Sequence, residues 1–564
     1  METKNWTLQV LDAFGKLPSG ILDGNFFLLG SFEQCVSVKV PRNQPDLFWK
    51  GKYCRADLSL YKDLEQIEEE KFCHQGIPNK NFAVLERLPE DAVCNVDVTC
   101  HDGLQFAKDA KAILMLCFIV AIAILILFGT CFHQSILTEQ ETEAKNKEQK
   151  SSWFSQLLLS FSLLTNVPKI LDTSRKPDQI ACLHGIRVLS ITWVVLGHTY
   201  YWSIKYLDNL KEAYSLPQYI LNQVLLNASM CVDSFYVLSA MLLTYLWFKH
   251  MVKVKGRDIR SPGFWINYVV HRYIRLTPVY MIILGVDICL MRYLADGPMW
   301  SPDGLEPNYC RKSWWTNLLY VNNFFQLDEV CMTWSWYLAN DMQFYLFAPI
   351  FLILLWINEI VGILAIVTGL LASGALKAAI VLSHDKWPPV SIFTVNPEQF
   401  DITDAYWNVL YIKPYIRCKP YLVGILLGYA LYKWGLQVKL PKWAVFVGWC
   451  SAIAAGFGVI FGLFGFSKTG DISPVGNAIY AAFGRTLWAL SLAWMIYACT
   501  TGHGGIVNSF LAWRVWMPFS RISYCAYLVH PLVIFVYYSS REQPIHFSSH
   551  YQMVQLHFNT FTPL

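Results

Sequence analysis

Charged residues are scarce in this sequence of 564 residues: Asp, Glu, Lys and Arg together make up 15% of it. In soluble domains about 25% of the residues are charged. Hydrophobic residues make up 54% of this chain. The net charge is only +4, and no basic tract with interleaved aromatic residues is present, so the usual features of a nucleic-acid-binding protein are excluded. The sequence also contains no internal repeat and no glycine-rich nucleotide loop. This scarcity of charge is typical of a polytopic membrane protein.

Long apolar runs fill most of the chain beyond residue 110. A helix that spans a bilayer needs about twenty mostly apolar residues. Segments of that kind lie at 112–130, 182–204, 222–248, 272–292, 333–357, 359–382, 419–435, 443–466, 476–501 and 521–540. We therefore predict an all-α polytopic membrane protein of about ten transmembrane helices, with a small disulfide-rich N-terminal luminal domain.

Composition divides the chain into five parts. They are a cysteine-containing luminal or extracellular domain (1–110), a first transmembrane helix (111–131), a cytosolic linker (132–180), a transmembrane body (181–540) and a polar C-terminal tail (541–564). The linker contains a run of mixed charge sign, which is typical of a solvated helix or tether.

The Lys and Arg residues of the short loops predict the orientation in the membrane. Five basic residues follow the third span: Lys249, Lys253, Lys255, Arg257 and Arg260. If this loop faces the cytosol, the N-terminal domain lies in the secretory lumen or outside the cell, although Lys108 and Lys111 taken alone favour the reverse. We predict an integral membrane protein of the secretory pathway. No retrieval tail distinguishes the endoplasmic reticulum from the plasma membrane.

Cysteine is concentrated in the N-terminal domain. Five lie there: Cys35, Cys54, Cys73, Cys94 and Cys100. On the extracytosolic side they predict a disulfide framework with one thiol unpaired. Met1 is followed by no apolar signal core, so a preceding segment with a signal peptide and a sixth cysteine explains both facts. A complete chain with one free thiol is the alternative.

Other features of the luminal side follow from the same orientation. Cys310 and Cys331 share a luminal loop and predict a further disulfide, and Asn5-Trp-Thr is a glycosylation acceptor. His74 and His101 each follow a cysteine, but their spacing matches no zinc motif. We therefore predict no metal site.

Two ionisable residues interrupt the second apolar segment. Arg187 and His198 are eleven residues apart, which is about three helical turns, so both project from nearly the same face, roughly 16 Å apart along the axis. Because ionisable groups are costly within a bilayer, the pair indicates a functional polar track. The alternative is that Arg187 snorkels to cytosolic headgroups and His198 satisfies a backbone group.

Two aspartates also lie within predicted spans. Asp233 needs a cationic or donor partner, for which His198 in a neighbouring helix is the expected candidate. The alternative is that Asp233 caps a broken helix. Asp341 in the fifth span is equally costly unless it is paired, and Lys377 and Arg485 are further intramembrane charges that can serve as partners for the aspartates.

Polar side chains in three further spans complete the set. Arg272 and Arg275 are three residues apart on one helical face, a pattern that suits phosphate binding and also fits a simple positive-inside bias. Gln343 adds polarity to the aromatic fifth span, and Tyr524 and His530 lie along one side of the tenth.

Four motifs in this order resemble the membrane acyltransferase type 3 superfamily. They are Arg187 and His198 with ten residues between them, Phe-Tyr-Val-Leu-Ser at 235–239, Arg-Tyr-Ile-Arg-Leu-Thr-Pro at 272–278 and Ser-Tyr-Cys-Ala-Tyr-Leu-Val-His-Pro at 523–531. The N-terminal Asp12-Ala-Phe-Gly-Lys-Leu-Pro-Ser-Gly-Ile-Leu-Asp-Gly-Asn and Leu29-Gly-Ser-Phe-Glu-Gln-Cys resemble the luminal domain of the nose-resistant-to-fluoxetine family. That animal branch fuses such a domain to the acyltransferase body.

Two departures from the family pattern stand out. Ala240 occupies a position where the superfamily usually has glycine, so close helix contact there is expected to be altered. The polar residues 541–564 stand where the family body normally closes with another transmembrane helix, which predicts a truncated or alternative C-terminus and puts activity in doubt.

The resemblance implies an O-acyltransferase that moves an acyl group from a cytosolic acyl-CoA-like donor to a hydroxyl acceptor at the luminal or extracellular side. It implies that Arg272 and Arg275 bind donor phosphates, that Arg187 holds the thioester region and that His198 is the general base, balanced by Asp233. Substrate contacts are expected from Ser239, Asp341, Gln343, Tyr524 and His530. Membrane lipids are the surrounding partners. The alternative function is a carrier or receptor for lipids or hydrophobic small molecules that keeps the scaffold without its chemistry.

Overall fold

The structure is a computed structural model of the chain. It describes residues 106–142, 152–175, 179–301, 309–326, 329–384, 405–470 and 472–548, together with residues 305 and 387 and a few positions among the first hundred. The predicted glycosylation acceptor Asn5 and the predicted disulfide partner Cys73 lie outside the described residues.

Four short strands are described in the N-terminal domain. They are β1 (Lys39–Pro41), β2 (Phe48–Lys50), β3 (Cys54–Tyr61) and β4 (Val93–Cys100), paired antiparallel as β1 with β2 and β3 with β4. The register places Cys54 opposite Cys100 and Leu60 opposite Cys94. Of the five cysteines in the predicted disulfide framework, Cys35 is half-buried, and the side chains of the other four lie outside those that the structure describes.

The membrane body is helical, as predicted. Eight described segments are long and apolar enough to cross a bilayer. They contain α3 (Ala110–Thr142), α9 (Met230–Lys253), α10 (Pro262–Cys289), α12 (Trp336–Ile357), α13 (Glu359–Leu382), α16 (Lys442–Phe461) with α17 (Phe464–Thr469), α18 (Pro474–Thr500) and α20 (Trp516–Ser539). The two other predicted spans form helices of similar length, α6 (Cys182–Ser203) and α15 (Pro414–Trp434), but these are more polar than the eight.

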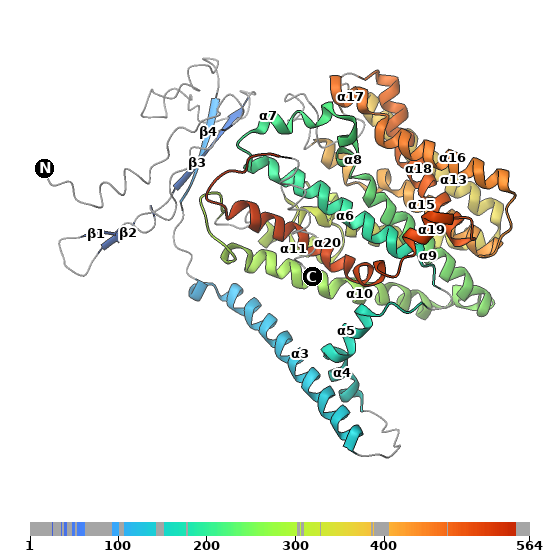
Figure 1. Cartoon of the computed structure of the whole chain (residues 1–564), viewed down its shortest axis with the longest axis horizontal. Coiled ribbons are helices and arrows are strands. Elements are labelled where there is room, and N and C mark those ends of the chain that lie inside the picture. Colours follow the sequence, from blue (N-terminus) through green and yellow to red (C-terminus); the bar gives the residue numbers. More distant parts are fainter. Residues whose placement is uncertain are drawn as a thin grey trace.

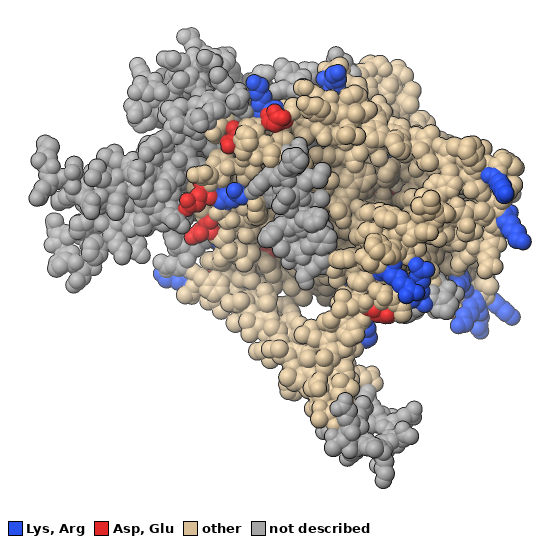
Figure 2. Space-filling view, viewed as in Figure 1, with Lys and Arg blue, Asp and Glu red and all other residues tan. Residues whose placement is uncertain are grey.

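Short elements connect these helices. They are the helices α4 (Trp153–Phe161), α5 (Leu163–Leu171), α7 (Leu210–Ala213), α8 (Gln223–Leu226), α11 (Cys310–Leu318) and α19 (Gly505–Leu511), a π-helical turn at Trp407–Tyr411, and 3₁₀ turns that include η4 (Phe106–Lys108) and η9 (Met291–Tyr293). On the face drawn in Figure 2, charged side chains are few and the shaft of α3 displays none. That surface composition suits a lipid environment.

The centre of the body is built on the close packing of α15 against α9. Gly424 makes this approach possible, because a Cβ atom there would lie 2.6 Å from the Val237 carbonyl oxygen and 2.7 Å from Ala240 Cβ. Ala240 is fully buried against this glycine. The altered contact expected at Ala240 is therefore accommodated by the facing helix, and the small pair keeps the two backbones close.

Residues 153–171 of the predicted linker form two helices, α4 and α5. In Figure 1, α3 stands away from the body and α4 and α5 run back from its far end. His133 of α3 contacts Ser162 Oγ at 3.0 Å and Thr165 Oγ1 at 3.1 Å. Arg521 of α20 donates to the carbonyl oxygens of residues 169, 170 and 172 at the end of α5. The linker is thereby fastened to both α3 and the body.

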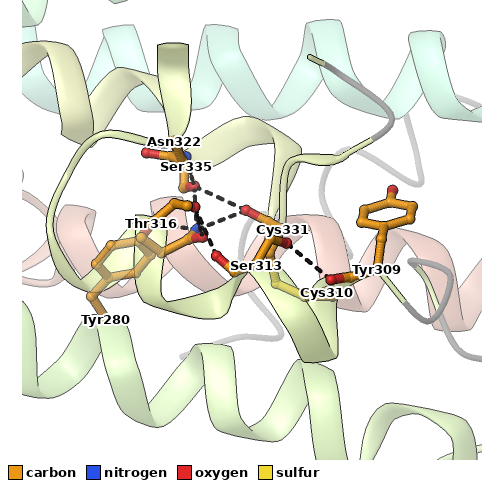
Figure 3. Close-up of a disulfide and its surroundings, with 9 residues drawn as sticks. Tyr280, Tyr309, Cys310, Ser313, Thr316, Asn322, Cys331 and Ser335 are labelled. Carbon is orange, nitrogen blue, oxygen red and sulfur yellow. Dashed lines mark hydrogen bonds between the residues drawn. A yellow bond between two sulfur atoms is a disulfide. The ribbon is translucent and has the colours of Figure 1, made fainter. Parts of the chain in front are cut away.

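A disulfide joins Cys310 to Cys331, as predicted. Figure 3 shows it at the start of α11, beside a hydrogen-bonded group that includes Ser335. At the centre of that group the Asn317 amide nitrogen donates to the Cys331 carbonyl oxygen at 2.7 Å. Asp287 lies close to both sulfur atoms. Because the sulfurs are bonded to each other, this trio offers no thiolate ligands for a metal.

The first residues of the predicted polar tail pack onto the body. Ile545 forms a parallel bridge with Leu207, and its carbonyl oxygen accepts a hydrogen bond from the Asp208 amide at 3.0 Å. Ile545 and Phe547 are buried. Residues 540–548 thus complete the end of the body next to α7, and residues 549–564 lie outside the described part of the chain.

Candidate functional site

Helix α6 carries Arg187 and His198 on one continuous helix, as the sequence predicts. This helix packs against α20. His198 Nδ1 lies 2.8 Å from His530 Nε2, and the two imidazole rings are nearly parallel, with centroids 5.0 Å apart and planes inclined by 9°. His530 is fully buried, whereas His198 keeps part of its surface accessible. The structure therefore brings together two histidines that are 332 residues apart in the chain.

The hydrogen bonds of the histidine pair determine its tautomers. His530 Nδ1 lies 3.1 Å from the Ala526 carbonyl oxygen. Because a carbonyl oxygen only accepts, Nδ1 of His530 carries the hydrogen, and in the neutral ring Nε2 is the acceptor. His198 Nδ1 must then donate to it, which leaves the lone pair on His198 Nε2. Among the described residues no group is hydrogen-bonded to His198 Nε2, so this atom has the form that a general base requires.

Aromatic side chains surround the histidine pair. The Trp202 ring lies 4.7 Å from the His198 ring, and Trp334 follows at 6.0 Å from Trp202. Tyr527, one turn before His530, donates its hydroxyl hydrogen to the Trp334 carbonyl oxygen at 2.5 Å. These rings make the surroundings of His198 largely apolar, which favours exclusion of water from a reacting group.

Arg187 lies toward the other end of α6, about three turns from His198. Its guanidinium group is half-buried and lies within electrostatic range of Arg275 from α10 and of Tyr337 from α12. In the part of the chain that the structure describes, neither Arg187 nor Arg275 has a hydrogen-bonding or ion-pair partner. Two neighbouring cations without a carboxylate between them form a site suited to an anion.

Tyr337 was missed by the sequence analysis, because a tyrosine in an aromatic segment gives no signal of its own. Its ring packs between Tyr236, at 4.8 Å, and Tyr527, at 5.6 Å. The same side chain is in electrostatic range of Arg187. Tyr337 therefore lies between the arginine end and the histidine end of the site.

Arg272 has a different environment from Arg275, although the sequence predicts that both bind phosphate. Arg272 forms an ion pair with Asp341 of α12, donates to Ser239 Oγ at 3.3 Å and lies 4.1 Å from the centroid of the Tyr345 ring. Asp341 is thus paired, as its burial requires. Arg272 is committed to these internal contacts, and of the two arginines Arg275 is the exposed one.

Asp233 does not pair with His198, so that expectation was wrong. The carboxylate, fully buried in the first turn of α9, accepts from Arg417 Nη1 at 3.2 Å and also pairs with Arg485. The prediction that Arg485 serves an aspartate is confirmed. Arg417 was missed because it lies just before the segment expected to span the membrane from residue 419. Its guanidinium carbon also lies 4.7 Å from the Trp336 ring, which holds it in place.

The remaining predicted substrate contacts are engaged in structural hydrogen bonds. Gln343 donates to the Tyr320 carbonyl oxygen at 2.8 Å and accepts from Asn323 at 3.0 Å, so it fixes the segment before α12. The Tyr524 hydroxyl donates to the Leu276 carbonyl oxygen at 2.9 Å and ties α20 to α10. The structure thus separates a candidate site at Arg187, Arg275 and His198 from polar groups that hold its helices together.

Comparison with known proteins identifies the family of the chain. Residues 180–554 match the acyltransferase domain family, and residues 1–94 match the N-terminal domain of nose resistant-to-fluoxetine proteins. The chain is 35% identical to nose resistant to fluoxetine protein 6 of Caenorhabditis elegans, over 98% of this chain and 75% of that protein. It is 28% identical to the regulator of hypoxia-inducible factor 1 of the same organism, over 48% of this chain and 54% of that protein. No solved structure matches. The chain therefore belongs to the nose-resistant-to-fluoxetine family, multi-pass membrane proteins that carry an acyltransferase domain.

Proposed function

We propose that the protein is an O-acyltransferase that moves an acyl group from a cytosolic acyl-CoA-like donor to a hydroxyl acceptor at the luminal or extracellular side. The observation that carries the proposal is the free lone pair on His198 Nε2, held in place by His530. In this proposal the N-terminal domain, with its cysteines and the glycosylation acceptor Asn5, lies on the luminal side of the endoplasmic reticulum or outside the cell.

Donor binding is assigned to the arginine end of the site. Arg187 and Arg275 are close enough for their charges to repel, and an anionic group between them would relieve that repulsion. The phosphates of an acyl-CoA-like donor supply such a group. Arg272 contributes indirectly, because its pair with Asp341 joins α10 to α12. In this assignment the thioester extends along α6 from Arg187 toward His198.

Acyl transfer is assigned to the histidine end. The acceptor hydroxyl attacks the thioester carbonyl carbon while His198 Nε2 takes the hydroxyl proton. This attack forms the new C–O bond and a tetrahedral intermediate. Collapse of the intermediate restores the carbonyl group and breaks the C–S bond, and the proton passes from His198 to the leaving thiolate. Asp233 takes no part in these steps, because its carboxylate is occupied by Arg417 and Arg485.

The donor assignment is tested with purified full-length protein, radiolabelled acyl-CoA and a lipid extract as the pool of acceptors. Release of free CoA thiol and appearance of labelled ester are measured together. Arg275→Gln should raise the KM for acyl-CoA more than it lowers kcat, because the arginine is exposed and binds the donor away from the reacting carbonyl. An unchanged KM would remove Arg275 from the donor site.

A carrier of lipids or hydrophobic small molecules is the second candidate function. The aromatic surroundings of His198, which include Trp202 and Trp334, suit an apolar ligand without any reaction. Movement of a labelled lipid across proteoliposome membranes that persists in His198→Ala, with no labelled ester in the wild type, would favour the carrier. Ester formation that disappears in His198→Ala favours the enzyme.

A further inference from the structure

A cavity of about 470 Å³, wide open to the surface, lies where α3 meets the end of α10, away from the candidate site. Lys108 comes from η4, Lys111 from the first turn of α3, Arg292 from η9, and Arg311 from the first turn of α11. The Cys310–Cys331 disulfide is adjacent to Arg311 in the chain and anchors that turn. Four basic side chains from four separate elements thus line one hollow.

Asp109 is the one acidic residue among those that line the cavity. Its carboxylate accepts from the amides of Lys111 and Ala112 at 3.1 and 3.2 Å, and from the Tyr293 hydroxyl at 2.9 Å. Burial acts to raise the pKa of Asp109, but these hydrogen bonds outweigh it and keep the pKa below its usual value. Asp109 therefore caps α3 and holds Tyr293, and among the described residues that line the cavity it is a single carboxylate against four basic side chains.

The hydrogen bonds and ring contacts show that this hollow is built by the fold. The Phe106 and Tyr293 rings meet edge to face at 5.1 Å, and Met115 of α3 lies against Gly285 of α10 one turn farther along. Arg292 stacks beside Tyr293, at 5.8 Å from the ring centroid, and its Nε is buried without a partner among the described residues. The contact of Met115 with Gly285 thus closes the seam between α3 and α10 on one side of the cavity. The cavity itself is lined with hydrogen-bond donors.

The wall that continues from the cavity is apolar and faces outward. Leu114, Leu116 and Phe118 of α3 are 69%, 42% and 50% exposed, and α3 is among the segments apolar enough to cross a bilayer. The basic groups lie at the end of this segment, at the level where a phospholipid carries its phosphate. A ligand with a phosphate at one end and hydrocarbon chains at the other fits both surfaces.

We propose that this cavity binds the phosphate headgroup of an anionic membrane phospholipid, whose acyl chains lie along the exposed face of α3. The lipid would bridge the anchoring helix of the N-terminal domain and α10, the helix that carries Arg275. This site requires no acyl transfer, so it stands independently of the proposed function.

Native mass spectrometry of the full-length protein in detergent tests the site with phosphatidylserine and phosphatidylcholine as probes. The test variant is Arg292→Gln/Arg311→Gln. The matched control is Lys439→Gln/Lys442→Gln, which removes two exposed charges at the distant start of α16. We expect the wild type and the control to retain phosphatidylserine in preference to phosphatidylcholine. The test variant should bind phosphatidylserine about tenfold more weakly or worse, because each basic residue near a membrane surface contributes measurably to lipid attraction.

Three results would overturn the proposal. The first is equal retention of phosphatidylserine by the test variant and the wild type. The second is an equal loss of phosphatidylserine binding in the test variant and the control. The third is that millimolar inorganic phosphate displaces bound phosphatidylserine as effectively as added lipid does. The last result would identify a site for a soluble phosphate. Thermal unfolding of each variant is measured alongside, and Lys108→Gln/Lys111→Gln, which changes only exposed side chains, provides a second test if the first variant does not fold.

Discussion

His530 holds His198 in one tautomer: a 2.8 Å hydrogen bond joins the rings, and His530 is itself fixed by the Ala526 carbonyl oxygen. In many hydrolases a carboxylate orients the base. In the mechanism that we propose, a second, neutral imidazole takes that position. Neutral His530 adds no buried charge to the site, so the pair avoids the desolvation cost that a buried carboxylate would bring.

Replacing His530 should separate orientation from base strength. His530→Gln offers an amide oxygen that can accept from His198 Nδ1, whereas His530→Ala offers no acceptor. We expect kcat to fall about tenfold or more in His530→Ala, with partial recovery in His530→Gln, because a hydrogen bond of this kind is worth about 1 kcal/mol or more. Steady-state kinetics measure kcat, and ¹⁵N NMR of the His198 imidazole reports its tautomer. Equal kcat values in wild type and His530→Ala would contradict the orienting role.

Removing the Asp233 charge should affect folding. Asp233→Asn leaves Arg417 and Arg485 buried without their counter-charge, which costs on the order of 3–5 kcal/mol. We expect a lower unfolding temperature and poor recovery of monodisperse protein in fluorescence-detected size-exclusion chromatography. Asp258→Asn is the control, because Asp258 pairs with His250 at an exposed position. A stable Asp233→Asn protein that has lost only its turnover would instead restore the catalytic role first expected of this residue.

The two arginines of α10 should give opposite phenotypes. Arg272→Gln leaves Asp341 unpaired inside the body, so we expect a loss of stability on the order of 3 kcal/mol. Arg275→Gln should leave the unfolding temperature within about 1 °C of wild type, since a surface substitution changes stability little, while it weakens donor binding. Thermal unfolding in detergent and acyl-CoA titration measure the two properties. Equal losses of stability in both variants would show that Arg275 also has a structural partner.

A side chain at Gly424 should disrupt the packing of α15 on α9. A new Cβ would meet the Val237 carbonyl oxygen and Ala240 Cβ at less than 3.0 Å, so Gly424→Ala is expected to destabilise the body by about 1–3 kcal/mol. Gly458→Ala in α16 is the matched control, because nothing lies within 4 Å of its added Cβ. Thermal unfolding of the two variants compares them directly. Similar curves would mean that the two helices can move apart without cost.

The sequence predicted the helices well because hydropathy and length decide them locally. It also placed Arg187 and His198 on one face, since that depends only on helical periodicity. The partners of buried charges were harder to predict. Asp233 and Arg417 are 184 residues apart, and neither hydropathy nor spacing indicates that α9 and α15 meet.

The histidine pair shows the same limit within the site. His530 was recognised as polar and part of a motif, but its contact with His198 depends on how α20 packs against α6. Arg272 and Arg275 look equivalent in sequence, and the structure distinguishes them because only Arg272 meets Asp341. Roles that depend on contact between distant helices require coordinates.

The most direct test of the account is the rate of acyl transfer by purified His198→Ala protein, measured with labelled acyl-CoA and a lipid-extract acceptor pool. Loss of a general base should lower kcat by about 10²–10⁴-fold, with an unfolding temperature close to that of the wild type. Transfer at the wild-type rate by a well-folded His198→Ala protein would contradict the assignment of His198 as the base.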